Sequence, residues 1–253
     1  GKHEWPPKEI IGNIFYWMEF CAYRNQLSQK NTTVIDEFLS NCKNDIKTLQ
    51  SKNDAFGEYQ IYIKITRFLS DIIDIQNYKD KITALEKSAN IQNELRLIEL
   101  ETEKEQKLQM YYQDAFSKND INWWKKEVSK INHLISQNPD NRDAFLYQRV
   151  LNFLSICGYS YSNNALQTNQ LENANRFITI YLLVDPNNPD PHYFQAELRA
   201  KENDTTKVFE SLENAIKVGF NDINKIQSDN NFIKFQSMPE WTKLLNKISN
   251  AKN

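Results

Sequence analysis

The 253-residue sequence predicts an all-α protein, in which an N-terminal helical bundle precedes stacked helix–turn–helix repeats. Apolar residues recur at intervals of three and four along most of the chain, which is the period of an amphipathic helix. The 5 glycines and 7 prolines are fewer than the tight turns of a sandwich or barrel require. An echo with a period of 34 residues indicates the repeats. Its members are Asn169, Ala174, Ile178 and Tyr181, which recur as Asn203, Val208, Leu212 and Ala215.

Composition bounds the class of protein. Hydrophobic residues make up 40% of the chain, enough for one large or two modest cores. The 31 basic and 33 acidic residues nearly cancel, whereas a nucleic-acid platform needs a concentrated basic surface. The longest apolar run, residues 10–22, is too short to cross a bilayer and contains Asn13 and Glu19. We therefore expect no nucleic-acid partner and no integral membrane segment.

The chain begins with Gly1 rather than Met, which favours an exported or periplasmic-side lipoprotein over a cytoplasmic protein. Its 3 cysteines, Cys21, Cys42 and Cys157, have no metal-like spacing. Each falls in an apolar or helical pattern, so we expect small buried side chains. A Cys21–Cys42 disulfide stays open as an alternative, if the first two helices pack antiparallel.

Three helices are expected in the first 75 residues. Pro6–Pro7 suits the first turn of a helix over 10–21, which is apolar on most sides and therefore expected to be central. Thr32 or Thr33 can cap the second helix, and Asp54 can cap the third. The third segment is rich in β-branched residues, but its apolar residues do not alternate with period two, so a helix is favoured over a strand.

Residues 79–117 predict one very long helix or two, with any break near 88–93. The stretch 99–107 is almost entirely charged or polar, and a helix that is polar all round usually crosses solvent. The predicted organisation is a bundle over 1–90, a connecting helix over 91–118, and repeats with a cap over 119–253.

Two helices in the second half of the chain end at similar turn sequences that contain proline. Pro139 and Pro186 follow two helix ends and are 47 residues apart, which is 13 more than the period. This excess is about three and a half helical turns, which a longer helix absorbs while keeping its buried face. We expect one elongated helix over 143–166, kinked at Gly158; a loop over 158–162 is the alternative.

These residues resemble tetratricopeptide repeats over about 108–250. In the best-matching unit, 189–222, Ala196 matches the small residue of the first helix and Asn203–Asp204 matches the turn. Gly219 stands in place of the closing proline. The tail is similar to the helical ending of many bacterial repeat arrays, so the resemblance implies a superhelical array with a C-terminal capping helix.

In this family the first helix of each unit lines a concave groove, and the resemblance implies a peptide site there. Arg149 and Arg199, on neighbouring helical faces, would bind a peptide carboxylate or backbone. The predicted groove residues are Leu146, Arg149, Val150, Phe153, Asp190, Tyr193, Glu197 and Arg199.

The sequence contains none of the motifs GxGxxG, GxxxxGK[ST], GxSxG or HExxH, and its 3 histidines are far apart. We therefore expect a protein- or peptide-binding scaffold or adaptor that is not an enzyme and holds no cofactor or metal. The alternative is a structural or envelope-associated protein that oligomerises through the charged helix near 99–107. The sequence leaves the partner's identity and the oligomeric state open.

Overall fold

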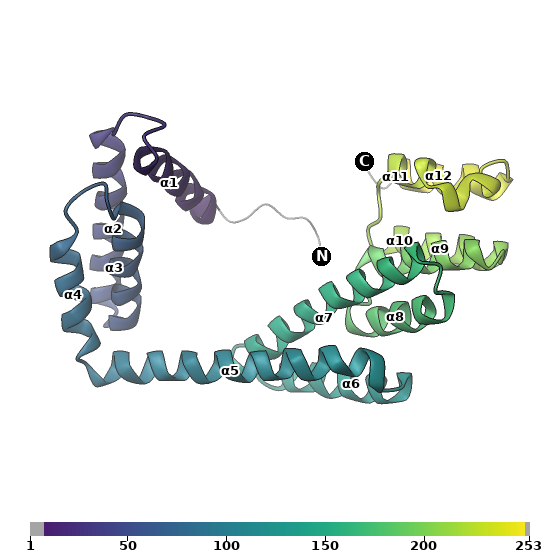
Figure 1. The fold of residues 1–253 in the computed structure, drawn as a ribbon, viewed down its shortest axis with the longest axis horizontal. Coiled ribbons are helices and arrows are strands. Elements are labelled where there is room, and N and C mark those ends of the chain that lie inside the picture. Colours follow the sequence, from purple (N-terminus) through teal and green to yellow (C-terminus); the bar gives the residue numbers. More distant parts are fainter. Residues whose placement is uncertain (1–7, 251–253) are drawn as a thin grey trace. The chain divides into compact units, whose positions relative to one another are not determined.

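The computed structural model describes residues 8–250, and every regular element in that range is helical (Figure 1). The all-α prediction is therefore confirmed for the part of the chain described. The first elements are α1 (Lys8–Arg24), α2 (Thr32–Ser51), α3 (Ala55–Leu69), α4 (Gln76–Glu86), α5 (Ala89–Lys118) and α6 (Ile121–Gln137). They are followed by α7 (Arg142–Gln167), α8 (Leu171–Val184), α9 (Pro189–Lys201), α10 (Thr205–Lys217), α11 (Ile223–Ser228), the 3-10 helix η1 (Asn230–Phe235) and α12 (Pro239–Asn250).

The described residues form two compact units, 8–101 and 102–250, and the boundary falls within α5. The stretch 79–117 is two helices, because α4 ends at Glu86 and α5 begins at Ala89. From there α5 continues without a break through the charged residues 99–107. None of the described helices is both long and apolar enough to cross a membrane.

In the N-terminal unit, α3 packs against α1, α2 and α4. Its core is aromatic: the Phe38 ring lies 5.2 Å from that of Phe20 and 5.4 Å from that of Phe68. The prediction that the first helix is central is wrong. Phe20 and Tyr23 are buried, but the opposite face of α1 is open, with Phe15 66% and Met18 55% exposed. A pattern that is apolar on most sides did not reveal which side of α1 is buried among the described residues.

Asparagine and aspartate side chains fix most helix starts. Asp54 caps α3 as predicted, accepting a hydrogen bond from the Gly57 amide at 2.8 Å. The cap of α2 is Asn31 rather than Thr32 or Thr33, and it accepts from the Thr33 amide at 3.0 Å. The predicted first-turn prolines, Pro6–Pro7, lie outside the described residues.

All three cysteines are free thiols, so the Cys21–Cys42 alternative is not realised. Cys42 and Cys157 are buried and Cys21 is half-buried. Burial raises the pKa of the Cys42 and Cys157 thiols, which keeps them protonated and poorly reactive.

In the C-terminal unit, α7 pairs with α8 and α9 pairs with α10. The elongated helix is confirmed, since α7 runs unbroken from Arg142 to Gln167, and the loop alternative is wrong. Gly158 lies in close contact with α8: a Cβ atom there would be 2.8 Å from Cβ of Tyr181. At the end of the chain, α12 packs on α10 and buries Trp241, Leu244 and Ile248.

The echo of 34 residues corresponds to two matching turns. Asn169 and Asn203 both adopt a left-handed conformation, with φ of 56° and 62°. In each case the next amide bonds back to the carbonyl five residues earlier, Gln170 to Ala165 at 2.8 Å and Asp204 to Arg199 at 3.0 Å. This is the Schellman arrangement, which asparagine tolerates better than most side chains. The echoed apolar residues after both turns are buried: Ala174, Ile178, Tyr181, Val208, Leu212 and Ala215.

Candidate functional site

The predicted groove residues lie on α7 and α9, but three of them belong to the core. Leu146, Val150 and Tyr193 are fully buried and present no surface to a peptide. Leu146 and Val150 form the stripe of α7 that packs inward, into the same core as Trp124 of α6. These three assignments are therefore corrected: the positions that the resemblance carried over face the core.

Tyr193 joins α9 to the segment that follows α11. Its hydroxyl donates to Asp229 Oδ2 at 2.8 Å, and its ring stacks on Phe220 with centroids 5.0 Å apart. Lys225 Nζ lies 4.5 Å from the centre of the Tyr193 ring. Replacing Tyr193 with alanine would leave a cavity and remove one hydrogen-bond donor from Asp229, so loss of this side chain cannot report on partner binding alone.

The other predicted residues are dispersed. Arg149 is exposed and pairs with Glu105 at 2.7 Å, and Arg199 pairs with Glu202 at 2.6 Å. Phe153 is half-buried against the α7 core, and Asp190 is half-buried in the first turn of α9. Arg149 thus contacts α5, whereas Arg199 contacts the residue that ends its own helix, so these predicted residues are not brought together by shared contacts.

Glu197 is the exception, because it belongs to a cluster of carboxyl groups. Burial raises the pKa of Glu197 to about 8, and the hydrogen bond and charge of Asp229 reinforce the shift. Lys225 and Lys201 oppose the increase. At neutral pH the Glu197 carboxyl is therefore mostly protonated and can donate to the Asp229 carboxylate. Because Asp229 also caps η1 by accepting from the Asn231 amide at 2.8 Å, this cluster joins α9 to the cap.

An exposed stripe along α7 was not predicted. It consists of Phe145, Arg149, Asn152, Ile156 and Tyr159, spaced by four, three, four and three residues, and we call it the α7 face. Its apolar members are 53%, 68% and 41% exposed for Phe145, Ile156 and Tyr159. Single exposed apolar side chains are ordinary, but several in one stripe mark an interaction surface.

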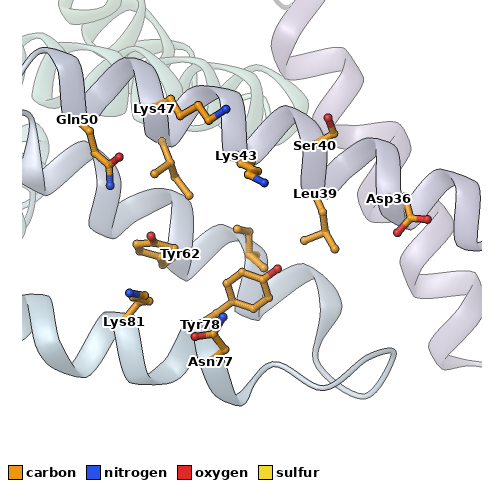
Figure 2. Close-up of a pocket in the computed structure, with 12 residues that line it drawn as sticks. Asp36, Leu39, Ser40, Lys43, Lys47, Gln50, Tyr62, Asn77, Tyr78 and Lys81 are labelled. Atoms are coloured by element: carbon orange, nitrogen blue, oxygen red, sulfur yellow. The ribbon is translucent and has the colours of Figure 1, made fainter.

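A groove in the N-terminal unit was also not predicted (Figure 2). It has a volume of about 650 Å³ and lies between α2 and α4, with α3 below. Its apolar lining consists of Leu39 and Ile46 from α2, Tyr62 and Ile65 from α3 and Tyr78 from α4, and its rim carries Lys43, Lys47 and Lys81. We call it the lysine groove. The nearest signal in the sequence was the pair Lys43 and Lys47, four residues apart and beside the apolar positions Leu39 and Ile46.

Within residues 8–250, no three His, Cys, Asp or Glu side chains are placed to hold a metal ion. A scan of the sequence against protein-family models found no match, and a search of curated proteins found none either.

Proposed function

We propose that this protein is a non-catalytic, protein-binding scaffold or adaptor, and that residues 108–250 are degenerate tetratricopeptide-like repeats. The matched turns at Asn169 and Asn203 support the repeat assignment, because both the backbone conformation and the hydrogen bonds recur after 34 residues. The successive helix pairs α7–α8 and α9–α10 support it as well. Arrays of this kind bind other proteins through surfaces built from successive helices.

The observation that carries the proposal is the α7 face. Phe145, Ile156 and Tyr159 lie exposed on one stripe of a helix of 26 residues, and the stripe also presents the polar side chains of Arg149 and Asn152. Large apolar anchors with polar neighbours are typical of the centre of a protein interface. Tyr159 is held in place by the Phe194 ring, with centroids 5.1 Å apart.

The test is quantitative affinity purification from the source cells with Ile156→Asp, which places a charge between Asn152 and Tyr159 on the α7 face. We expect proteins captured by the wild type to fall by about tenfold or more, because a buried unpaired charge opposes association. Ile233→Asp is the matched control, since Ile233 is 59% exposed on η1. Circular dichroism should show the same helix content for all three proteins. The proposal fails if both variants recover the same partners in the same amounts.

A second candidate is a helical assembly protein that oligomerises through α5. Leu97, Leu100 and Met110 are exposed along that helix, and the charged stretch 99–107 lies between Leu97 and Met110. Under this alternative, the mass measured by light scattering rises with concentration, and Leu97→Glu with Leu100→Glu abolishes the rise. A monomer at every concentration would contradict it.

A further inference from the structure

The lysine groove has features of a binding site that the α7 face does not share, and it lies in the other unit. We propose that it binds an acidic amphipathic helix of a partner protein. The inference is independent of the proposed repeat function, so either can fail without the other.

The shape of the groove suits a helix. Its α2 wall runs from Asp36 to Gln50, which is about 21 Å of helix at roughly 1.5 Å per residue. The walls are formed by α2 and α4 and the floor by α3, so a helix laid between them would contact three helices at once (Figure 2). An amphipathic helix placed in an apolar groove is a recurring mode of peptide recognition.

The apolar contacts of the groove come from the half-buried Leu39, Ile46 and Tyr78, whereas Tyr62 and Ile65 beneath them are buried. Tyr62 and Tyr78 lie with ring centroids 6.4 Å apart, and the Tyr62 hydroxyl donates to Glu58 of the same helix at 3.2 Å. Leu39 and Ile46, two turns apart on α2, are only half-buried. Leucine side chains at helical spacing on a ligand would remove the remaining apolar surface from water.

The rim selects for acidic ligands. Lys43 and Lys47 come from α2 and Lys81 from α4, so both walls are positively charged. In the described chain none of the three is in an ion pair, whereas Lys64 on α3 pairs with Asp45. Among the described residues that line the groove, Asp36 is the one carboxylate, and it lies at one end.

The spacing of the rim matches a helical ligand. Lys43 and Lys47 are one turn apart, about 6 Å along the axis. Two glutamates four residues apart on a helix aligned with α2 repeat that spacing, so both pairs form in one register. Opposite charges across an interface favour the matching partner and speed its association.

Other occupants fit less well. A bilayer is flat, so its headgroups reach the lysines without contacting the floor. The exposed face of α1 has no acidic residue between Ile10 and Met18, so in a second copy it would leave the lysines without partners. The charged stretch of α5 is a poor ligand for the groove, because it carries Lys104 and Lys107 among its glutamates.

The test measures fluorescence anisotropy of a labelled helical peptide of about fourteen residues. Leucines occupy one of its faces and glutamates flank them; a matched peptide carries lysines in place of the glutamates. We expect the glutamate peptide to bind the 253-residue wild-type chain and the lysine peptide not to bind. Lys43→Glu with Lys47→Glu should weaken binding of the glutamate peptide about tenfold or more. Added salt should weaken binding to the wild type.

The control is Lys79→Glu with Lys87→Glu, which makes the same change in net charge at exposed lysines outside the groove. Its affinity for the glutamate peptide should stay close to that of the wild type. Equal weakening by both double variants would overturn the site. The proposal is also overturned if the wild type binds phosphatidylcholine–phosphatidylglycerol vesicles but not the peptide, and if Lys43→Glu with Lys47→Glu abolishes the vesicle binding. It fails as well if the wild-type protein self-associates, the same two substitutions abolish that self-association, and the glutamate peptide does not inhibit it.

Discussion

Glu197 couples the stability of the C-terminal unit to pH. Its carboxyl is raised to a pKa of about 8 by burial and by Asp229, while an unfolded glutamate titrates near about 4.3. The charged groups that act on it are Asp229, Lys225 and Lys201, and the Tyr193 hydroxyl also bonds to Asp229. The folded state therefore binds this proton more tightly than the unfolded state does.

The sign of the effect follows from that difference. A group whose pKa is raised on folding contributes its stability in full below the unfolded pKa and loses it as the pH rises through the folded pKa. For Glu197 this contribution to stability begins to fall at about pH 4 and is lost above about pH 8. Deprotonation leaves a buried anion beside Asp229, which weakens the connection between α9 and the cap.

Glu197→Gln should remove this dependence, because glutamine keeps a donor toward Asp229 and cannot ionise. We expect the variant's free energy of unfolding, relative to that of the wild type, to increase from about pH 5 to about pH 8 and then to level off. Urea unfolding at several pH values measures the difference, with Glu210→Gln, an exposed carboxyl on α10, as control. A difference from the wild type that is constant across this range would contradict the coupling.

At the scale of the element, the contact between α7 and α8 depends on a missing side chain. The space beside Gly158 is filled by Cβ and Cγ of Tyr181, which cannot move away without shifting the α8 backbone. Tyr181 is itself buried in the core of the repeat region. The absence of a side chain at Gly158 therefore permits close packing of the two helices, even though glycine is a poor helix former.

Gly158→Ala should lower the free energy of unfolding by about 1 kcal/mol. Overpacking costs typically 1–3 kcal/mol and outweighs a gain of up to about 1 kcal/mol in helix propensity. Gly12→Ala is the matched control, because Gly12 is also inside a helix and has no atom within 4 Å of its added Cβ. Urea denaturation should show opposite signs for the two variants; stabilisation by both would contradict the close contact.

Features decided by neighbouring residues were predictable from the sequence. The elongated α7, the cap at Asp54 and the turn at Asn203 follow from local spacing and side-chain chemistry. Each forms through contacts within a few residues of the chain, and so leaves a local pattern.

The face that each helix presents to solvent was not predictable in the same way. On α7 both the buried stripe with Leu146 and the exposed stripe with Ile156 are apolar, so periodicity could not separate core from surface. The lysine groove requires α2, α3 and α4 to be brought together, and its residues extend from Asp36 to Lys81. Such sites depend on tertiary packing, which a periodic pattern in one helix does not encode.

At the scale of the whole molecule, the chain is organised around separate cores. The N-terminal core draws its buried members from Phe20 to Ile72. The two cores of the other unit draw theirs from Tyr112 to Ile248, and the half-buried Phe177 packs against both of them. The helix α5 crosses the boundary between the units, since Ile91 is buried in its first turn and Phe116 near its end.

Separate cores should give two units that open independently. Phe38→Ala and Leu212→Ala each remove a large, fully buried side chain, and such truncations cost about 2–5 kcal/mol. Native-state hydrogen exchange then reports the cost locally. Amides that exchange only when their unit opens will exchange faster when that unit is destabilised. We expect Phe38→Ala to accelerate exchange in α2 and α3 by about 30-fold or more while leaving α8 and α10 unchanged, and Leu212→Ala to do the reverse.

The amides of α5 decide between independent opening and a single cooperative molecule. If the units open separately, Phe38→Ala accelerates exchange of the amides of residues 89–101, and Leu212→Ala accelerates exchange of those of residues 102–118. The response to each substitution then changes within one continuous helix. If α5 transmits destabilisation instead, each variant accelerates exchange along the whole helix and into the other unit. Equal acceleration of α3 and α10 by either substitution would show that the boundary within α5 does not separate folding units.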